Sequence, residues 1–205
     1  MIEKIKNKTA KITIVGMGYI GLPTSIAFAQ AGFNVNGYDV NEEVISTLKS
    51  GKIHIKEPDL QQVFEKVLNS DKLKPINKLE KSDVFIICVP TPFIKKENKK
   101  LSDISYVESA SKAVASFVEK DTLVILESTV PPMTTNEVVG KIIEEETKLK
   151  LNEDFYLSYC PERVLPGKIL YELKNNDRIV GSSSEKAQKI TKELYESILT
   201  TGKAY

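Results

Sequence analysis

Three closely spaced glycines stand where a buried strand is expected to end. Gly16, Gly18 and Gly21 fit the pattern G-x-G-x-x-G and directly follow the β-branched run 11–15. In a strand–turn–helix unit the first glycine permits a tight turn, the second lets a pyrophosphate approach the backbone, and the third lets the helix pack on the strand. The helix that follows offers unpaired N–H groups and the positive end of its dipole to phosphates. The segment therefore predicts a phosphate-binding loop made of Gly16, Gly18, Tyr19, Ile20 and Gly21.

An acidic residue stands at the end of the next expected strand, 34–39. Asp39 follows the last glycine at about the 20-residue spacing that is usual in dinucleotide-binding units. A carboxylate there accepts a hydrogen bond from the adenosine ribose 2′-hydroxyl and repels a 2′-phosphate, which favours NAD over NADP as the cofactor. The alternative interpretation of Asp39 is a residue at the strand end that caps the neighbouring helix. The combination of loop and acid favours the NAD site.

Apolar runs and helical patterns alternate along the chain. The expected strands lie at 11–15, 34–39, 83–89, 122–126, 155–159 and 178–180. The expected helices run from the glycine loop to about Ala31, from the cap Asn41 to near Gly51, and over 57–69, 104–117, 138–143 and 187–198. Continuous apolar strands are typical of a parallel sheet covered on both faces, and strand–helix alternation implies right-handed crossovers. We therefore predict one α/β domain over 1–205, a Rossmann-type doubly wound, mainly parallel sheet with helices on both faces.

The charge balance and the rare residue types exclude several classes of function. Lys and Arg number 29 against 28 Asp and Glu, and a net charge of +1 argues against nucleic acid or an anionic membrane as a partner. A single histidine excludes a multi-histidine metal site. Two cysteines cannot form a disulfide framework, so they indicate a reducing, cytoplasmic location.

Two charged segments invite other interpretations. The lysines within 4–11 and the apolar stretch 12–31 resemble a signal peptide, but the glycines interrupt that stretch and cleavage would remove the first strand, so export is disfavoured. The lysine-rich segment 95–100 is expected to be a solvated loop rather than a phosphate site.

Five motifs in a fixed order carry a more specific resemblance. They are G-M-G-Y-I-G-L-P at 16–23, H-I-K-E-P-D-L at 54–60, V-P-T-P-F at 89–93, E-S-T-V-P-P at 127–132 and C-P-E-R-V-L-P-G-K at 160–168. Together they resemble the N-terminal NAD-binding domain of the UDP-glucose/GDP-mannose dehydrogenase family. Within this family the His-Ile before Glu-Pro and the run 163–167 are most similar to members that oxidise UDP-N-acetylmannosamine.

The resemblance implies an activity and several residue roles. Such enzymes oxidise the C6 alcohol of a UDP-sugar to a carboxylate in two NAD-dependent steps, through an intermediate on a cysteine, and supply precursors of surface polysaccharides. Thr129 matches a threonine beside the nicotinamide and a catalytic water, and Glu162 matches a glutamate that acts through this water as a general base. Pro90 and Thr91 match a loop under the cofactor. The sugar-nucleotide pocket would involve Glu162, Arg163, Val164, Leu165 and Lys168.

Position alone leaves some of these roles open. Without the resemblance, the V-P-T-P motif is better interpreted as a strand terminator, because proline cannot continue a central strand. Thr129 is also interpretable as a turn hydroxyl. Glu162 stands at a strand end, where open α/β sheets bind ligands. Met133 stands where the family commonly has glycine, so the turn there is not expected to need a left-handed residue.

The cysteines do not match the nucleophile of the family. Cys88 lies inside an apolar strand and is expected to be a buried, inert thiol, and Cys160 has only Arg163 as a candidate stabilising cation. The family's catalytic lysine, asparagine and cysteine, its central helix with the usual homodimer contact, and its nucleotide-binding second domain have no counterpart in this sequence. We therefore expect the chain to bind NAD without turnover. Alternatives are another substrate (UDP-glucose, UDP-N-acetylglucosamine or GDP-mannose), or a stand-alone NAD-binding module without catalysis.

Overall fold

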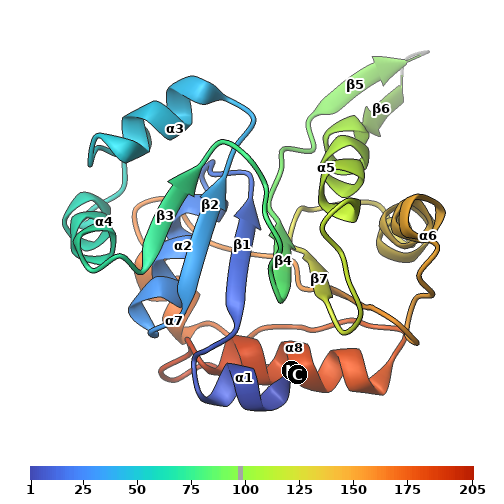
Figure 1. Ribbon diagram of the computed structural model, residues 1–205. Coiled ribbons are helices and arrows are strands. Elements are labelled where there is room, and N and C mark those ends of the chain that lie inside the picture. Colours follow the sequence, from blue (N-terminus) through green and yellow to red (C-terminus); the bar gives the residue numbers. More distant parts are fainter. Residues whose placement is uncertain (97–98) are drawn as a thin grey trace.

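A single parallel sheet forms the centre of the computed structural model, which describes residues 1–96 and 99–205. The sheet has six strands in the order β3–β2–β1–β4–β7–β8, and every adjacent pair is parallel. Figure 1 shows this order from β3 to β7. Counted along the chain within this sheet, the order is that of a Rossmann fold, and it reverses between β1 and β4. The strands are β1 (Lys11–Val15), β2 (Asn34–Tyr38), β3 (Leu73–Ile76), β4 (Val84–Ile87), β7 (Leu123–Leu126) and β8 (Tyr156–Tyr159).

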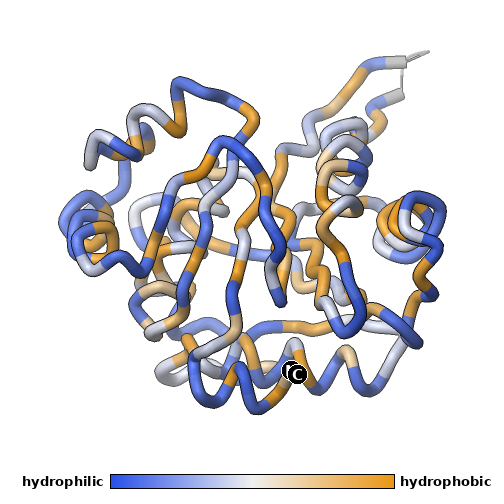
Figure 2. Tube along the Cα trace, in the orientation of Figure 1, coloured by the Kyte–Doolittle hydropathy of each residue, from blue (hydrophilic) through white to orange (hydrophobic). Residues whose placement is uncertain are grey.

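Two hydrophobic cores cover the two faces of the sheet. Successive strand residues alternate between the cores: Ile14 and Ile86 belong to one, and Val15 and Ile87 to the other. Figure 2 shows hydrophobic residues gathered along the central strands. The strands are thus buried on both sides, as their continuous apolar sequences predicted.

Helices from different parts of the chain pack on each face. The first core involves α1 (Ile2–Lys6), α2 (Gly21–Gln30), α4 (Leu60–Asn69), α7 (Ile169–Asn175) and α8 (Glu185–Glu196). The second involves α5 (Ser105–Ala115), the π-helical segment η1 (Thr135–Gly140) and α6 (Lys141–Thr147). Among the helices within these described ranges, none is long and apolar enough to cross a lipid bilayer.

Most predicted elements are confirmed, and the capping of α3 (Glu42–Lys49) is confirmed in detail. The Asn41 side chain accepts a hydrogen bond from the Glu43 N–H at 2.9 Å. The strand predicted at 178–180 is wrong, because Arg178 forms only an isolated bridge, to Ala204. Strand β3 was not predicted. It contains Pro75, which is tolerated because β3 is an edge strand.

Two local predictions need correction. The lysine-rich segment is not simply a loop: β5 (Phe93–Lys96) and β6 (Lys99–Ser102) pair as an antiparallel hairpin, while residues 97 and 98 of the predicted loop lie outside the described residues. Met133 adopts φ of 70°, so the turn after the Pro-Pro does use the left-handed region. The expectation from its residue type was therefore wrong, and a non-glycine residue there carries backbone strain.

Candidate functional site

The three glycines have different surroundings, and these explain their different roles. Gly16 has φ of 97°, and a Cβ added there would lie 2.6 Å from the carbonyl oxygen of Cys88. A Cβ on Gly21 would lie 1.8 Å from the carbonyl oxygen of Gly16. A Cβ on Gly18 would meet nothing within 4 Å. The fold therefore requires the first and third glycines, whereas the second faces open space into which a ligand phosphate can come close to the backbone.

Asp39 follows β2 and contacts the glycine loop through its carboxylate. One oxygen accepts a hydrogen bond from the Met17 N–H at 2.8 Å, and the other accepts one from the Asn41 N–H at 2.9 Å. The second bond is the capping-type contact that the alternative interpretation proposed. A carboxylate has about four acceptor positions, so two bonds leave capacity for ribose hydroxyls.

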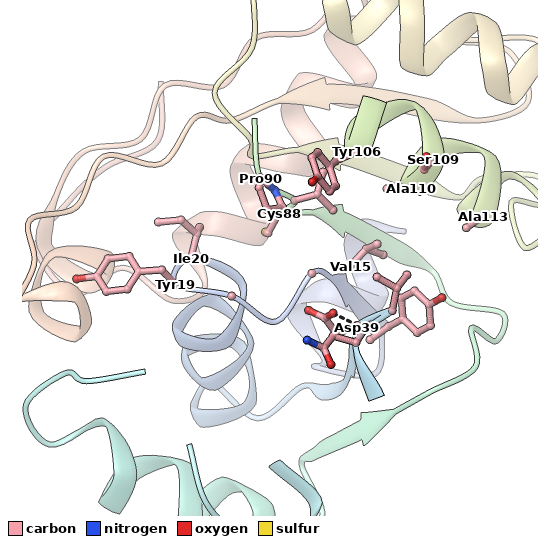
Figure 3. Close-up of a pocket in the computed structure, with 16 residues that line it drawn as sticks. Val15, Tyr19, Ile20, Asp39, Cys88, Pro90, Tyr106, Ser109, Ala110 and Ala113 are labelled. Carbon is pink, nitrogen blue, oxygen red and sulfur yellow. Dashed lines mark hydrogen bonds between the residues drawn. The ribbon is translucent and has the colours of Figure 1, made fainter. Parts of the chain in front are cut away.

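A cleft of about 600 Å³ opens between the glycine loop, Asp39 and α5. Figure 3 shows Asp39 on one side of the loop, with Pro90 and Tyr106 on the opposite wall. Apolar groups dominate these walls, and the exposed side chain of Val40 stands at the rim. The lining can accommodate a flat aromatic ring such as adenine. The cleft is lined by Val15, Gly16, Gly18, Tyr19, Ile20, Tyr38, Asp39, Val40, Asn41, Cys88, Val89, Pro90, Tyr106, Ser109, Ala110 and Ala113.

The strand order of the sheet reverses between β1 and β4, which is the switch point of the fold. On the β4 side of this point, the segments that follow β4 and β7 are connected by hydrogen bonds. The Thr91 hydroxyl donates to the Thr129 carbonyl oxygen at 2.7 Å, and the Ser128 hydroxyl donates to the Val89 carbonyl oxygen at 2.7 Å. Pro90 lines the cleft, and Thr129 is exposed. The structure thus brings Pro90, Thr91 and Thr129 together at the carboxyl edge of the sheet, where open α/β sheets bind ligands.

Glu162 follows β8 but does not face open solvent. Its side chain is only 4% exposed and contacts the Arg178 guanidinium, and one carboxylate oxygen accepts a hydrogen bond from the Arg163 N–H at 2.7 Å. Burial raises the pKa of Glu162 to about 7, against the opposing effect of the Arg178 cation. A carboxyl group with a pKa close to neutrality can exchange a proton under physiological conditions.

Sequence reasoning did not single out the buried partners of Glu162. Glu127, directly after β7, accepts hydrogen bonds from the Tyr195 hydroxyl at 2.8 Å, the Cys88 thiol at 3.0 Å and the Thr24 hydroxyl at 3.3 Å. The Arg178 Nη1 atom lies 3.6 Å from the same Glu127 carboxylate. One available signal was a carboxylate at the end of a buried strand, since Glu127 opens the E-S-T-V-P-P motif.

Both cysteines are buried and protonated thiols. Burial raises the pKa of Cys88 well above its ordinary value and raises the pKa of Cys160 to about 12. The burial expected of Cys88 is confirmed. The cation that acts on Cys160 is Arg178, whereas Arg163, the candidate from the sequence, is exposed.

Glu57 connects the glycine loop to the segment 163–168. The Gly167 N–H donates to the Glu57 carboxylate oxygens at 2.9 and 3.0 Å, and the Tyr19 hydroxyl donates to the same carboxylate. Burial and the Glu57 carboxylate raise the pKa of Tyr19 to about 12. Figure 3 shows the Tyr19 ring directed away from Asp39. Glu57 belongs to the H-I-K-E-P-D-L motif, yet its role was not predicted.

The residues expected to bind the sugar nucleotide lie outside the cleft. Arg163, Leu165 and Lys168 are exposed. Arg163, Val164 and Leu165 line an open groove with 172 and 175–177, and the Leu165 N–H donates to the Glu172 carboxylate at 2.7 Å. The structure therefore places this group apart from the glycine loop, and Glu57 accepts hydrogen bonds from both regions.

The sheet order, the glycine loop and the acid at the end of β2 define a Rossmann-type dinucleotide-binding domain. Residues 10–199 match the model of the UDP-glucose/GDP-mannose dehydrogenase family, NAD binding domain. The chain belongs to this family, and its cofactor is NAD.

Relatives and solved structures support the same family assignment. The whole chain is 42% identical to the UDP-N-acetyl-D-mannosamine dehydrogenase of Methanocaldococcus jannaschii and covers 46% of that protein. Over 92% of the chain it is 44% identical to the enzyme of the same name from Pyrococcus horikoshii, of which it covers 45%. The structure of the UDP-N-acetyl-mannosamine dehydrogenase from Staphylococcus aureus superposes with a TM-score of 0.90 at 45% identity, over 95% of this chain and 47% of that one. The chain thus spans about half the length of the relatives it matches.

Proposed function

We propose that this chain, over 1–205, is the NAD-binding domain of a nucleotide-sugar 6-dehydrogenase that oxidises UDP-N-acetylmannosamine. The observation that carries the proposal is the glycine loop beside Asp39, at the switch point of a chain that is 42% identical to a UDP-N-acetyl-D-mannosamine dehydrogenase. In the proposed reaction the C6 alcohol loses a hydride and a proton to give an aldehyde. Addition of water to the aldehyde, followed by loss of a second hydride and two protons, gives the carboxylate, so one sugar reduces two NAD molecules.

The residues proposed to bind NAD and those proposed to act in the reaction lie at opposite ends of the edge formed by the carboxyl ends of the strands. On the β2 side, Asp39 would hold the adenosine ribose, and the N–H groups around Gly18 would receive the pyrophosphate. Bound NAD supplies the hydride acceptor. On the β4–β7–β8 side, Thr129 would face the reacting groups and Glu162 would accept a proton at its carboxylate. This assignment rests on the strand ends from which each residue comes and on the near-neutral pKa of Glu162.

Within this proposal the chain alone binds NAD and does not oxidise the sugar. The second oxidation proceeds through an activated thiolate in enzymes that use a thioester. Both cysteines are buried, and their pKa values are raised, so neither supplies that nucleophile. The nucleophile and the remaining sugar-nucleotide contacts would come from a second domain.

Calorimetric titration of the chain with NAD and with NADP tests the cofactor assignment. NAD should bind more tightly than NADP, because Asp39 repels a 2′-phosphate. Equal affinities, or preference for NADP, would contradict the assignment of Asp39.

A hybrid protein tests the substrate. The chain would replace the matched half of the Staphylococcus aureus relative, and NADH formation would be recorded with four nucleotide sugars. Turnover should be fastest with UDP-N-acetylmannosamine. A faster rate with UDP-glucose, UDP-N-acetylglucosamine or GDP-mannose would overturn the substrate assignment.

A further inference from the structure

Two buried carboxylates share one guanidinium group behind the carboxyl edge of the sheet. Glu127 and Glu162 follow the neighbouring strands β7 and β8, and both approach the Nη1 atom of Arg178. The side chains of Glu127, Glu162 and Arg178 are 0%, 4% and 3% exposed. We call these three residues the buried charge cluster. A single cation cannot neutralise two carboxylates, so one of them is left with an uncompensated charge in a poorly solvated place.

The surroundings of the two carboxylates differ. Glu127 accepts hydrogen bonds from three neutral side chains, namely those of Tyr195, Cys88 and Thr24. Among the residues that the structure describes, Glu162 has only the Arg178 guanidinium and the Arg163 N–H. Donors that point at a carboxylate favour its ionised form. The Arg178 cation also favours ionised Glu162, but burial outweighs it and raises the pKa of Glu162 to about 7, so Glu162 can take up a proton near neutral pH.

The other titratable groups that face the cluster do not compete for this proton. Burial raises the pKa of the Tyr195 hydroxyl, from α8, and that of the Cys88 thiol, from the end of β4, well above their ordinary values. Burial also raises the pKa of Cys160, which follows β8, to about 12. All three remain neutral near pH 7, and arginine remains charged.

We propose that Arg178 and Glu127 are positioning residues for Glu162. Arg178 holds the Glu162 carboxylate in place. Glu127 places a second carboxylate next to the same guanidinium, so that Glu162 shares the cation when it exchanges its proton. The inference rests on the proposed function only in treating this proton exchange as part of the sugar oxidation.

The two positioning residues should change the titration of Glu162 in opposite directions. Carbon-13 NMR of the glutamate side-chain carboxyls in the whole chain follows this titration, and the Glu162 signal is identified by its loss in Glu162→Gln. Arg178→Gln removes a cation and should raise the Glu162 midpoint by about 1–3 pH units. Glu127→Gln removes an anion of nearly the same shape and should lower the midpoint by a similar amount.

Two control variants separate charge from shape. Arg178→Lys keeps the cation and should leave the midpoint closer to that of the wild type than Arg178→Gln does. Glu137→Gln makes the same chemical change at an exposed ion pair with Lys141 and should leave the midpoint where it is. A shift in the same direction for Arg178→Gln and Glu127→Gln would indicate a general loss of structure and would overturn the proposal.

The wild-type chain provides a further test that needs neither Arg178→Gln nor Glu127→Gln to fold. A Glu162 midpoint near 4.3, the ordinary value for glutamate, would overturn the proposal by itself. If Arg178→Gln does not fold, the direction of the Glu127→Gln shift decides. NAD titration of the same samples reports separately on the proposed function, since a chain that fails to bind NAD leaves the NMR result unaffected.

Discussion

Replacing Gly18 by alanine should affect stability and cofactor binding with opposite signs. In the free protein a Cβ at this position has no neighbour within 4 Å, and Gly18 is not among the glycines with positive φ. The fold can therefore accept the methyl group. If the pyrophosphate binds at this N–H, the same methyl group occupies the space through which the phosphate must approach.

The magnitudes follow from these surroundings. A glycine-to-alanine change at a compatible φ stabilises a protein by about 0.4–1 kcal/mol, because the unfolded chain loses conformational freedom. Loss of a hydrogen bond to a charged phosphate costs about 1.5–3 kcal/mol, which weakens NAD binding about 10- to 150-fold. Gly21→Ala should behave differently, because its Cβ would lie 1.8 Å from a backbone oxygen. The backbone shift that relieves this overlap should lower the free energy of unfolding by about 3 kcal/mol, at the upper end of the destabilisation that overpacking usually causes.

Denaturant unfolding and NAD calorimetry on Gly18→Ala, Gly21→Ala and a control variant test this prediction. Gly181→Ala serves as the control, because its Cβ would make only an ordinary contact at 3.9 Å to the Tyr159 carbonyl oxygen, and it should leave the NAD affinity unchanged. Wild-type NAD affinity in Gly18→Ala would refute the phosphate approach at this position. A large loss of stability in Gly18→Ala would refute the description of open space around it.

Three more outcomes are expected. Asp39→Ala should weaken NAD binding by about 1–3 kcal/mol and should reduce the ratio of NAD affinity to NADP affinity. An equal loss of binding free energy for both cofactors in calorimetry would argue against contact between Asp39 and the 2′-hydroxyl. Because burial raises the pKa of Glu162 to about 7, its ionisation opposes folding. The free energy of unfolding of the wild type relative to Glu162→Gln should therefore fall, by about 3 kcal/mol at most, as the pH rises from 4.5 to 7, and a pH-independent difference in urea unfolding would contradict this. Glu57→Gln should weaken the hydrogen bonds from the Gly167 N–H and speed hydrogen exchange at that amide. Glu65→Gln is the surface control. Equal exchange rates at Gly167 in the two variants would show that Glu57 does not hold the segment 163–168.

The parts of the fold that follow local rules were predictable from the sequence. Continuous apolar runs placed the buried strands correctly, and Asn41 was recognised as a cap because a short polar side chain before a helical pattern satisfies an N–H of the first turn. Strand β3 was missed because Leu73–Ile76 alternates with a lysine and contains a proline, which is acceptable only at a sheet edge. Whether a segment forms an edge strand is decided by the assembled sheet and is not visible in four residues.

The candidate site was predictable only where a motif fixes the backbone. The glycine loop and Asp39 have a characteristic spacing, and the structure brings them into contact through the Met17 N–H. The buried charge cluster has no such spacing, because its members come from three distant segments and meet only after the sheet has formed. Arg178 in particular lies in a segment expected to be a strand, and nothing in the sequence around it indicates two carboxylate partners.

Cofactor binding and proton exchange depend on different kinds of groups in this structure, and Cys88 lies between them. Among the residues that the structure describes, no lysine or arginine lines the cleft, so the charge of a pyrophosphate would be met by backbone N–H groups and the N-terminal end of α2. The charges available for proton exchange lie in the buried charge cluster instead. Cys88 lines the cleft and donates its thiol hydrogen to Glu127, so one small side chain contacts both regions. A protonated thiol is required for that contact, which gives a structural reason for a buried cysteine whose raised pKa prevents it from acting as a nucleophile.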